Sequence, residues 1–167
     1  MTAPDMKPYA NATPPLVLET FFNGKTTAHG TVEDWRGRVT RRFHAEIVGT
    51  FDTKAGTGIL DETFWWNDGE VQKRVWNVRK TGKNADGFDT YAGTAGDVVG
   101  EATGVAAGNT LNWRYTLAVP VNGKPLHLQL DDWMYLLPDG TLMNLTTMHK
   151  FGLKVGRISL FIQPVKK

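Results

Sequence analysis

TLNWRYTLAVPVNGKPLHLQLDDWMYL, residues 110–136, is the stretch of sequence that decides the fold of this chain. Its centre is Asn122-Gly123, the strongest two-residue signal for a β-hairpin, so Val121 is expected to pair with Lys124. This register places ten alternate side chains on one face, and nine of the ten are apolar or aromatic. They are Leu111, Trp113, Tyr115, Leu117 and Val119, with Leu126, Leu128, Leu130, Asp132 and Met134. The opposite face, on the solvent side, pairs Arg114 with Asp131, so both faces agree with one register.

The turn before this hairpin supports the register independently. A two-residue Gly108-Asn109 loop pairs Ala107 with Thr110. Small residues then lie opposite large ones, as interdigitated packing requires. The expected pairs are Val98 with Val119, Gly100 with Leu117, Ala102 with Tyr115, Gly104 with Trp113, and Ala106 with Leu111.

The turn after the hairpin extends the apolar face to a further strand. Pro138-Asp139-Gly140 fits a type I turn closed by a left-handed glycine, so Leu137 is expected to pair with Thr141. This pairing directs three polar side chains of the two strands into the interior beside Trp113. They are Asp132, Asn144 and Thr146.

The rest of the chain follows the same pattern of short β-rich runs separated by Gly, Asn and Asp. Turn signals recur every ~8–15 residues without a helical period, which predicts an all-β, antiparallel up-and-down β-barrel of about ten strands. One short helical turn is expected within residues 16–24, ending at Gly24. A length of 167 residues predicts one domain. Residues 1–15, rich in proline and without an apolar run, are expected to form a disordered tail, and residues 16–167 the barrel domain.

Composition excludes several classes of protein. A net charge of +2 with both signs interspersed predicts no nucleic-acid partner. The chain has no cysteine, which excludes disulfides, thiolate chemistry and a lipidated cysteine in the chain as given. It shows no signal peptide and no apolar run of the ~20 residues that a transmembrane segment needs, which favours a cytoplasmic location as given. Four scattered histidines predict no metal site, a lone serine, Ser159, excludes serine-hydrolase chemistry, and no cofactor motif is present.

A second polar pair is expected between the strands that flank Asn67-Asp68-Gly69. A three-residue loop there places Glu62 directly across from Arg74, whereas a two-residue turn would put them on opposite faces. Arg74 among aromatic side chains is suited to clamping a ligand carboxylate. The alternative is a structural ion pair satisfied by Glu62 alone, which is the more common arrangement.

Asp132 is the one acidic residue on the apolar face of the central hairpin. Burial among Leu130, Met134 and Trp113 disfavours its charged form unless Trp113, Asn144 or Thr146 donate hydrogen bonds. It is therefore a candidate catalytic base or an anchor for a ligand hydroxyl or amine, or else a structural group that ties strands together. The predicted ligand-binding residues are Glu62, Arg74, Trp76, Trp113, Tyr115, Asp132, Met134, Asn144 and Thr146.

Several blocks of this sequence are similar to one bacterial family. They are LETFFNG (residues 18–24), RRF (41–43), RVW (74–76), DVVG (97–100), DDWMY (131–135) and KFG (150–152). Across residues 16–161 the chain resembles the domain-of-unknown-function 3833 family. The resemblance implies a calycin-like barrel, often carried as an envelope lipoprotein, although this chain lacks the lipidated cysteine of those members. It also implies a fatty-acyl or other lipid ligand, because members are often encoded near lipid-modifying enzymes, and leaves peripheral membrane association open.

Three hypotheses of function follow from these observations. The first is a binding protein that holds a small apolar ligand, of fatty-acyl or other lipid type, inside the barrel. The second is a cofactor-free isomerase, cyclase or hydratase acting on a lipid-like substrate with Asp132 as general base. The third is a structural protein with a filled barrel. Whether the chain is an enzyme stays open at this level.

Overall fold

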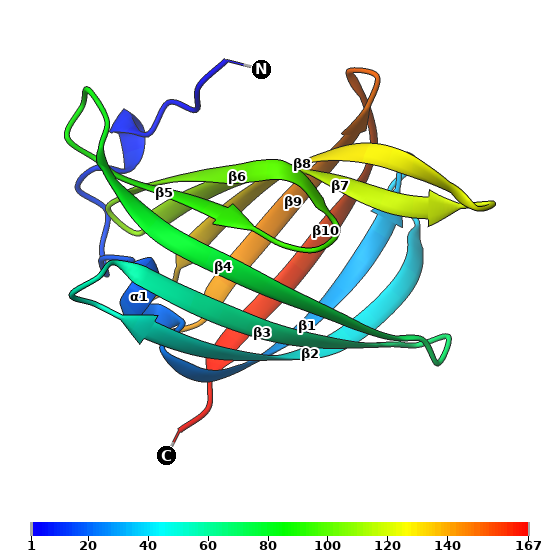
Figure 1. Cartoon of the computed structure of the whole chain (residues 1–167), viewed down its shortest axis with the longest axis horizontal. Helices are drawn as coiled ribbons and strands as arrows, with labels where there is room; N and C mark the ends of the chain where they lie inside the picture. The colour runs from blue at the N-terminus through cyan, green and yellow to red at the C-terminus, as the bar shows by residue number, and fades with distance from the viewer. Residues whose placement is uncertain (1, 167) are drawn as a thin grey trace.

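The computed structural model describes residues 2–166, which form a closed antiparallel barrel of ten strands (Figure 1). Each strand pairs with its neighbours in the chain, and β1 pairs with β10 to close the barrel. The all-β up-and-down barrel expected from the sequence is therefore confirmed. The strands are β1 (Gly24–Asp34), β2 (Val39–Asp52), β3 (Thr57–Trp66), β4 (Val71–Lys83), β5 (Asp89–Thr94), β6 (Val98–Ala107), β7 (Thr110–Val121), β8 (Lys124–Leu136), β9 (Leu142–Lys150) and β10 (Leu153–Pro164).

The register of the central hairpin is confirmed along its whole length. Val121 pairs with Lys124, Trp113 with Asp132, and Arg114 with Asp131. The next hairpin also has the expected register, with Leu136 opposite Leu142 and Asp132 opposite Thr146. The three-residue loop at Asn67-Asp68-Gly69 is confirmed by the pairing of Glu62 with Arg74.

The pairing of β6 with β7 is confirmed near the turn and wrong farther away from it. Ala107 pairs with Thr110 and Gly104 with Trp113 as expected, but Val98 pairs with Leu117 rather than with Val119. The register shifts between Val99 and Thr103. Gly100, in this interval, has a φ of +67°, a left-handed conformation typical of a glycine in a β-bulge. Gly100 is therefore a bulge residue and does not lie opposite Leu117.

A short helix closes one end of the barrel (Figure 1). The helical turn expected within residues 16–24 is α1 (Leu18–Phe21), and Gly24, at a φ of +111°, begins β1. Leu18 and the adjacent Phe22 are buried and belong to the apolar core of the barrel. Glu19 holds the helix in place, because it accepts a 2.7 Å hydrogen bond from the Tyr91 hydroxyl and ion-pairs with Lys80 at 3.1 Å.

The N-terminal segment differs from the expected disordered tail. It contains a single 3-10 turn, η1 (Lys7–Tyr9), and packs against the outer surface of the barrel. Met6 is 2 % exposed beside Val105 and Ala107, and the Tyr9 ring lies 5.7 Å from that of Trp133. Isolated apolar residues such as Met6 and Tyr9 give no periodic signal in the sequence, so their contacts with the barrel could not be predicted from the pattern. Within residues 2–166 no helix is both long and apolar enough to cross a bilayer.

Trp113 fills the interior because two glycines of neighbouring strands make room for its ring. A Cβ built at Gly104 would lie 2.5 Å from the indole, and one at Gly93 would lie 2.9 Å from it. Gly104→Val is therefore expected to lower the free energy of unfolding by ~1–3 kcal/mol through overpacking. Urea unfolding monitored by tryptophan fluorescence measures this effect. Gly96→Val is the control, since a Cβ at Gly96 meets no atom of residues 2–166 within 4 Å, and equal losses in both variants would contradict the packing argument.

Candidate functional site

The barrel encloses a cavity of about 700 Å³. Its lining is mostly aliphatic and aromatic, and includes Leu18 and Phe22 from the end that α1 closes. All nine residues predicted from the sequence as ligand-binding line this one cavity. The structure therefore brings them together, while their role in binding stays a prediction.

Asp132 is the most unusual group in the cavity lining. The residue is 5 % exposed, and its Oδ1 atom is buried without a hydrogen-bond partner among the described residues. The expected donation from Trp113 and Asn144 to this carboxyl group is absent within residues 2–166. Instead, the Thr146 hydroxyl lies 3.4 Å from Asn144 Oδ1. Asp132 therefore presents an unpaired acceptor atom inside a mostly apolar cavity. A hydrogen-bond donor on a ligand would satisfy this acceptor.

Burial controls the ionisation of the two interior carboxyl groups. Burial raises the pKa of Asp132 to about 7, a shift that the Thr146 hydroxyl opposes and the charge of Asp131 increases. Burial also raises the pKa of Glu62 to about 7, against the opposing charge of Arg74. Burial and the charge of Asp132 raise the pKa of Tyr115, so its phenol stays protonated and remains a donor. Near neutral pH, Asp132 is able both to accept and to release a proton.

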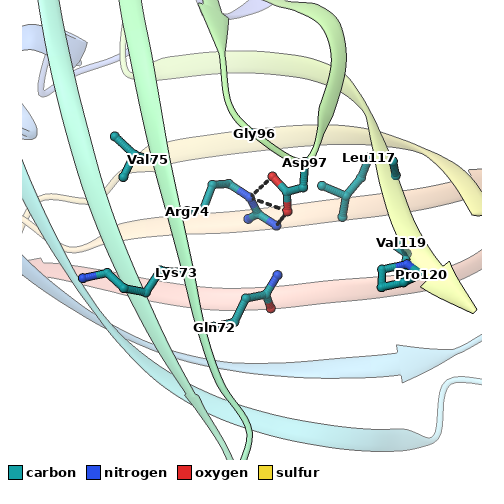
Figure 2. Close-up of a pocket in the computed structure, with 10 residues that line it drawn as sticks. Gln72, Lys73, Arg74, Val75, Gly96, Asp97, Leu117, Val119 and Pro120 are labelled. Atoms are coloured by element: carbon teal, nitrogen blue, oxygen red, sulfur yellow. Dashed lines mark hydrogen bonds and ion pairs between the residues drawn. The ribbon is translucent and has the colours of Figure 1, made fainter. Parts of the chain in front are cut away.

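Arg74 has a partner that the sequence did not reveal. Its Nη1 atom lies 4.0 Å from Glu62 Oε1, as expected for an ion pair of two mostly buried side chains. The shorter contacts go to Asp97, with Nε 2.9 Å from Oδ1 and Nη2 2.8 Å from Oδ2 (Figure 2). Burial works against the charged guanidinium, but the hydrogen bonds to Asp97 and the surrounding negative charges, those of Glu62 and Asp97 included, together outweigh it and raise the pKa of Arg74. Asp97 lies in the loop between β5 and β6. The alternation of side chains that predicts which face a strand residue occupies does not apply in a loop, so it gives no information about where the Asp97 side chain lies.

The Arg74–Asp97 pair lies in a side recess of the barrel wall (Figure 2). The recess has a volume of about 520 Å³ and is bordered by β4 on one side and β7 on the other. It exists because β5 is short: the pairing of β4 with β5 begins only at Asn77, and that of β6 with β7 ends at Leu117. Arg74 lines both the recess and the interior cavity, as do Gln72, Leu117, Val119 and Pro120.

Asp131, the chain neighbour of Asp132, has a different environment on the outer face. Its Oδ1 accepts hydrogen bonds from Asn112 Nδ2 at 2.8 Å and Arg114 Nε at 3.0 Å, and Trp133 Nε1 lies 3.3 Å from Oδ2. The expected pair with Arg114 is therefore present. The expectation that it lies in solvent is wrong, because the side chains of Asp131 and Arg114 are only 18 % and 19 % exposed.

These groups permit two kinds of chemistry. The cavity can hold an apolar molecule and meet a hydroxyl or N–H group of that molecule with Asp132. A carboxyl group with a pKa near 7 in a mostly apolar cavity is also suited to proton transfer. Among residues 2–166 no three His, Asp or Glu side chains come together as ligands for a metal ion.

Comparison with solved structures finds a protein of the same fold. It is the S-type phycobiliprotein lyase CPES from Guillardia theta, with a TM-score of 0.63 and 7 % sequence identity, and the alignment covers 89 % of this chain and 91 % of the lyase. At this identity the similarity shows the fold alone. No curated protein matches this sequence.

The family comparison agrees with the resemblance seen in the sequence blocks. The family described as "Protein of unknown function (DUF3833)" matches residues 1–164. The match includes the N-terminal segment that packs on the barrel, α1 and all ten strands up to the last residue of β10. This chain therefore belongs to the DUF3833 family.

Proposed function

We propose that this chain binds a small, largely apolar ligand, of fatty-acyl or other lipid type, inside the barrel. The observation that carries the proposal is Asp132 Oδ1, a buried atom in the lining of the 700 Å³ cavity that has no hydrogen-bond partner in the described part of the chain. A cavity within the usual range of ~300–1,000 Å³, apolar with few polar groups, is typical of a small-molecule site. An unpaired buried acceptor costs about 1–3 kcal/mol, and a ligand donor would remove that cost. The fold similarity to the phycobiliprotein lyase supports the proposal at the level of architecture only.

Asp132→Ala is expected to weaken binding of an anthroyloxy-labelled fatty alcohol by about tenfold, because one hydrogen bond to a buried carboxyl group is lost. Fluorescence titration measures the affinity at neutral pH. Native mass spectrometry of freshly purified protein is the parallel test for a co-purified lipid. Gln129→Ala is the matched control, an exposed residue on the same strand, β8. Equal affinities for both variants, or no saturable binding to the wild type, would contradict the proposal.

A second function is favoured by the ionisation of Asp132. With a pKa of about 7 and a free oxygen atom, Asp132 meets the requirements of a general base for a cofactor-free isomerase, cyclase or hydratase. The protonated Tyr115 phenol, on the strand next to β8, is suited to stabilising negative charge that develops on a substrate. Asp132→Asn separates the two functions. Loss of turnover with binding retained would identify an enzyme, and loss of binding alone a binding protein.

A further inference from the structure

The barrel wall has a second polar site besides Asp132, at the side recess between β4 and β7. Arg74 is the cation of this site, and its side chain is only 11 % exposed. It lines both the recess and the interior cavity, so a group bound to it would be accessible from outside and would lie next to the barrel interior. Figure 2 shows the Arg74 side chain directed from β4 toward the loop that carries Asp97.

Asp97 occupies the position on Arg74 that suits a carboxylate. Both of its oxygen atoms contact the guanidinium, through Nε and Nη2, in the two-point geometry by which arginine binds carboxylates. The Asp97 side chain is 30 % exposed, against 11 % for Arg74. Its backbone is held separately, because Asp97 O accepts a 2.8 Å hydrogen bond from Ala118 N. Rotation of the side chain toward solvent would therefore free Arg74 without detaching the loop from β7.

We propose that the side recess is a carboxylate site, where the head group of an amphipathic monocarboxylic acid replaces Asp97 on Arg74 while its apolar chain lies in the barrel. This inference rests on the proposed function, since it needs the interior to accept the apolar chain. Glu62 lies 4.0 Å from Arg74 on its other side. It competes only weakly with a ligand carboxylate for the Arg74 guanidinium near neutral pH, because burial raises the pKa of Glu62 to about 7 and leaves part of it uncharged. Lys73 also lines the recess but is 64 % exposed and paired with Asp61 at 3.8 Å.

The experiment compares anthroyloxy-labelled stearic acid with its methyl ester, which has the same chain and no charge. Asp97→Asn removes the internal competitor and is expected to tighten binding of the acid about threefold or more, with binding of the ester unchanged. Arg74→Gln is expected to weaken binding of the acid about tenfold and to change binding of the ester less than about twofold. Arg79→Gln is the matched control, an exposed cation on the same strand that lines neither the recess nor the interior cavity, and its loss is expected to change neither affinity.

Arg74→Gln leaves Glu62 without its cation, so thermal melts check that each variant is folded. If Arg74→Gln does not fold, Arg74→Lys and Asp97→Asn carry the test: the lysine cannot reproduce two-point binding and is expected to weaken binding of the acid selectively. Equal affinity for acid and ester in the wild type, or no tightening in Asp97→Asn, overturns the carboxylate site and leaves the proposed function standing. Absence of saturable binding of both probes overturns both.

Discussion

Asp131→Ala is expected to lower the free energy of unfolding by about 2–4 kcal/mol, because it removes the acceptor for three donors at once. The most costly loss is at Asn112, which is 1 % exposed and whose Nδ2 atom donates to Asp131 at 2.8 Å. Arg114 and Trp133 lose their contacts in the same step, in surroundings that the N-terminal segment partly shields from water. Urea melts monitored by circular dichroism measure the change.

Asp61→Ala is the control for this prediction. Asp61 is also an acidic residue on the outer face of the barrel, but its side chain is 50 % exposed and its only ion pair within residues 2–166, to Lys73, spans 3.8 Å. Its removal is expected to cost about 0–1 kcal/mol. A loss in Asp131→Ala no larger than that in Asp61→Ala would show that the Asn112–Arg114–Trp133 contacts do not stabilise the barrel.

The comparison of Asp131 with Asp132 shows what local patterns determine. The two-residue turn at Asn122-Gly123 determines which of the two side chains points inward, because side chains alternate along a strand, and the structure confirms this assignment. By the same logic the loop at Asn67-Asp68-Gly69 determines that Glu62 faces Arg74. All nine predicted lining residues follow from such turns, since each lies on a strand whose register a hairpin turn determines.

Contacts outside the strand ladder could not be predicted in this way. Asp97 reaches Arg74 from a loop, and only the short length of β5 opens the wall at that position. Gly100 was expected to provide space for Leu117, but its positive φ produces a bulge that shifts the register by two residues. Met6 packs beside Val105 and Ala107, and Tyr9 packs on Trp133, from a segment with no periodic pattern. In each case, the deciding contact joins a strand to a segment whose position is not determined by pairing.

The stability of this protein is expected to fall as the pH rises from 5 to 8.5. Glu62 and Asp132 have ordinary pKa values of 4.5 and 3.8, and burial raises both to about 7 in the folded protein. At pH values between the ordinary pKa and the raised pKa of each group, the folded state binds more protons than the unfolded state, so a rise in pH favours unfolding. The stabilisation is complete below the ordinary pKa values and is lost as the pH passes through 7. Since one pKa unit corresponds to 1.36 kcal/mol, each group is expected to contribute about 2–3 kcal/mol of loss across this range.

Urea melts of the wild type and Asp132→Asn at pH 5 and pH 8.5 test this expectation. The amide does not titrate, so the variant is expected to lose the Asp132 part of the pH dependence, to keep only the Glu62 part, and to exceed the wild type in stability at pH 8.5. Glu101→Gln is the control, because Glu101 is exposed and its hydrogen bond to Arg79 lowers its pKa, which places its titration below this range. Asp132→Asn with the full wild-type pH dependence would mean that Asp132 titrates as an ordinary carboxyl group. That result would contradict the buried, uncharged Asp132 on which the proposed ligand binding and the proposed proton transfer both rest.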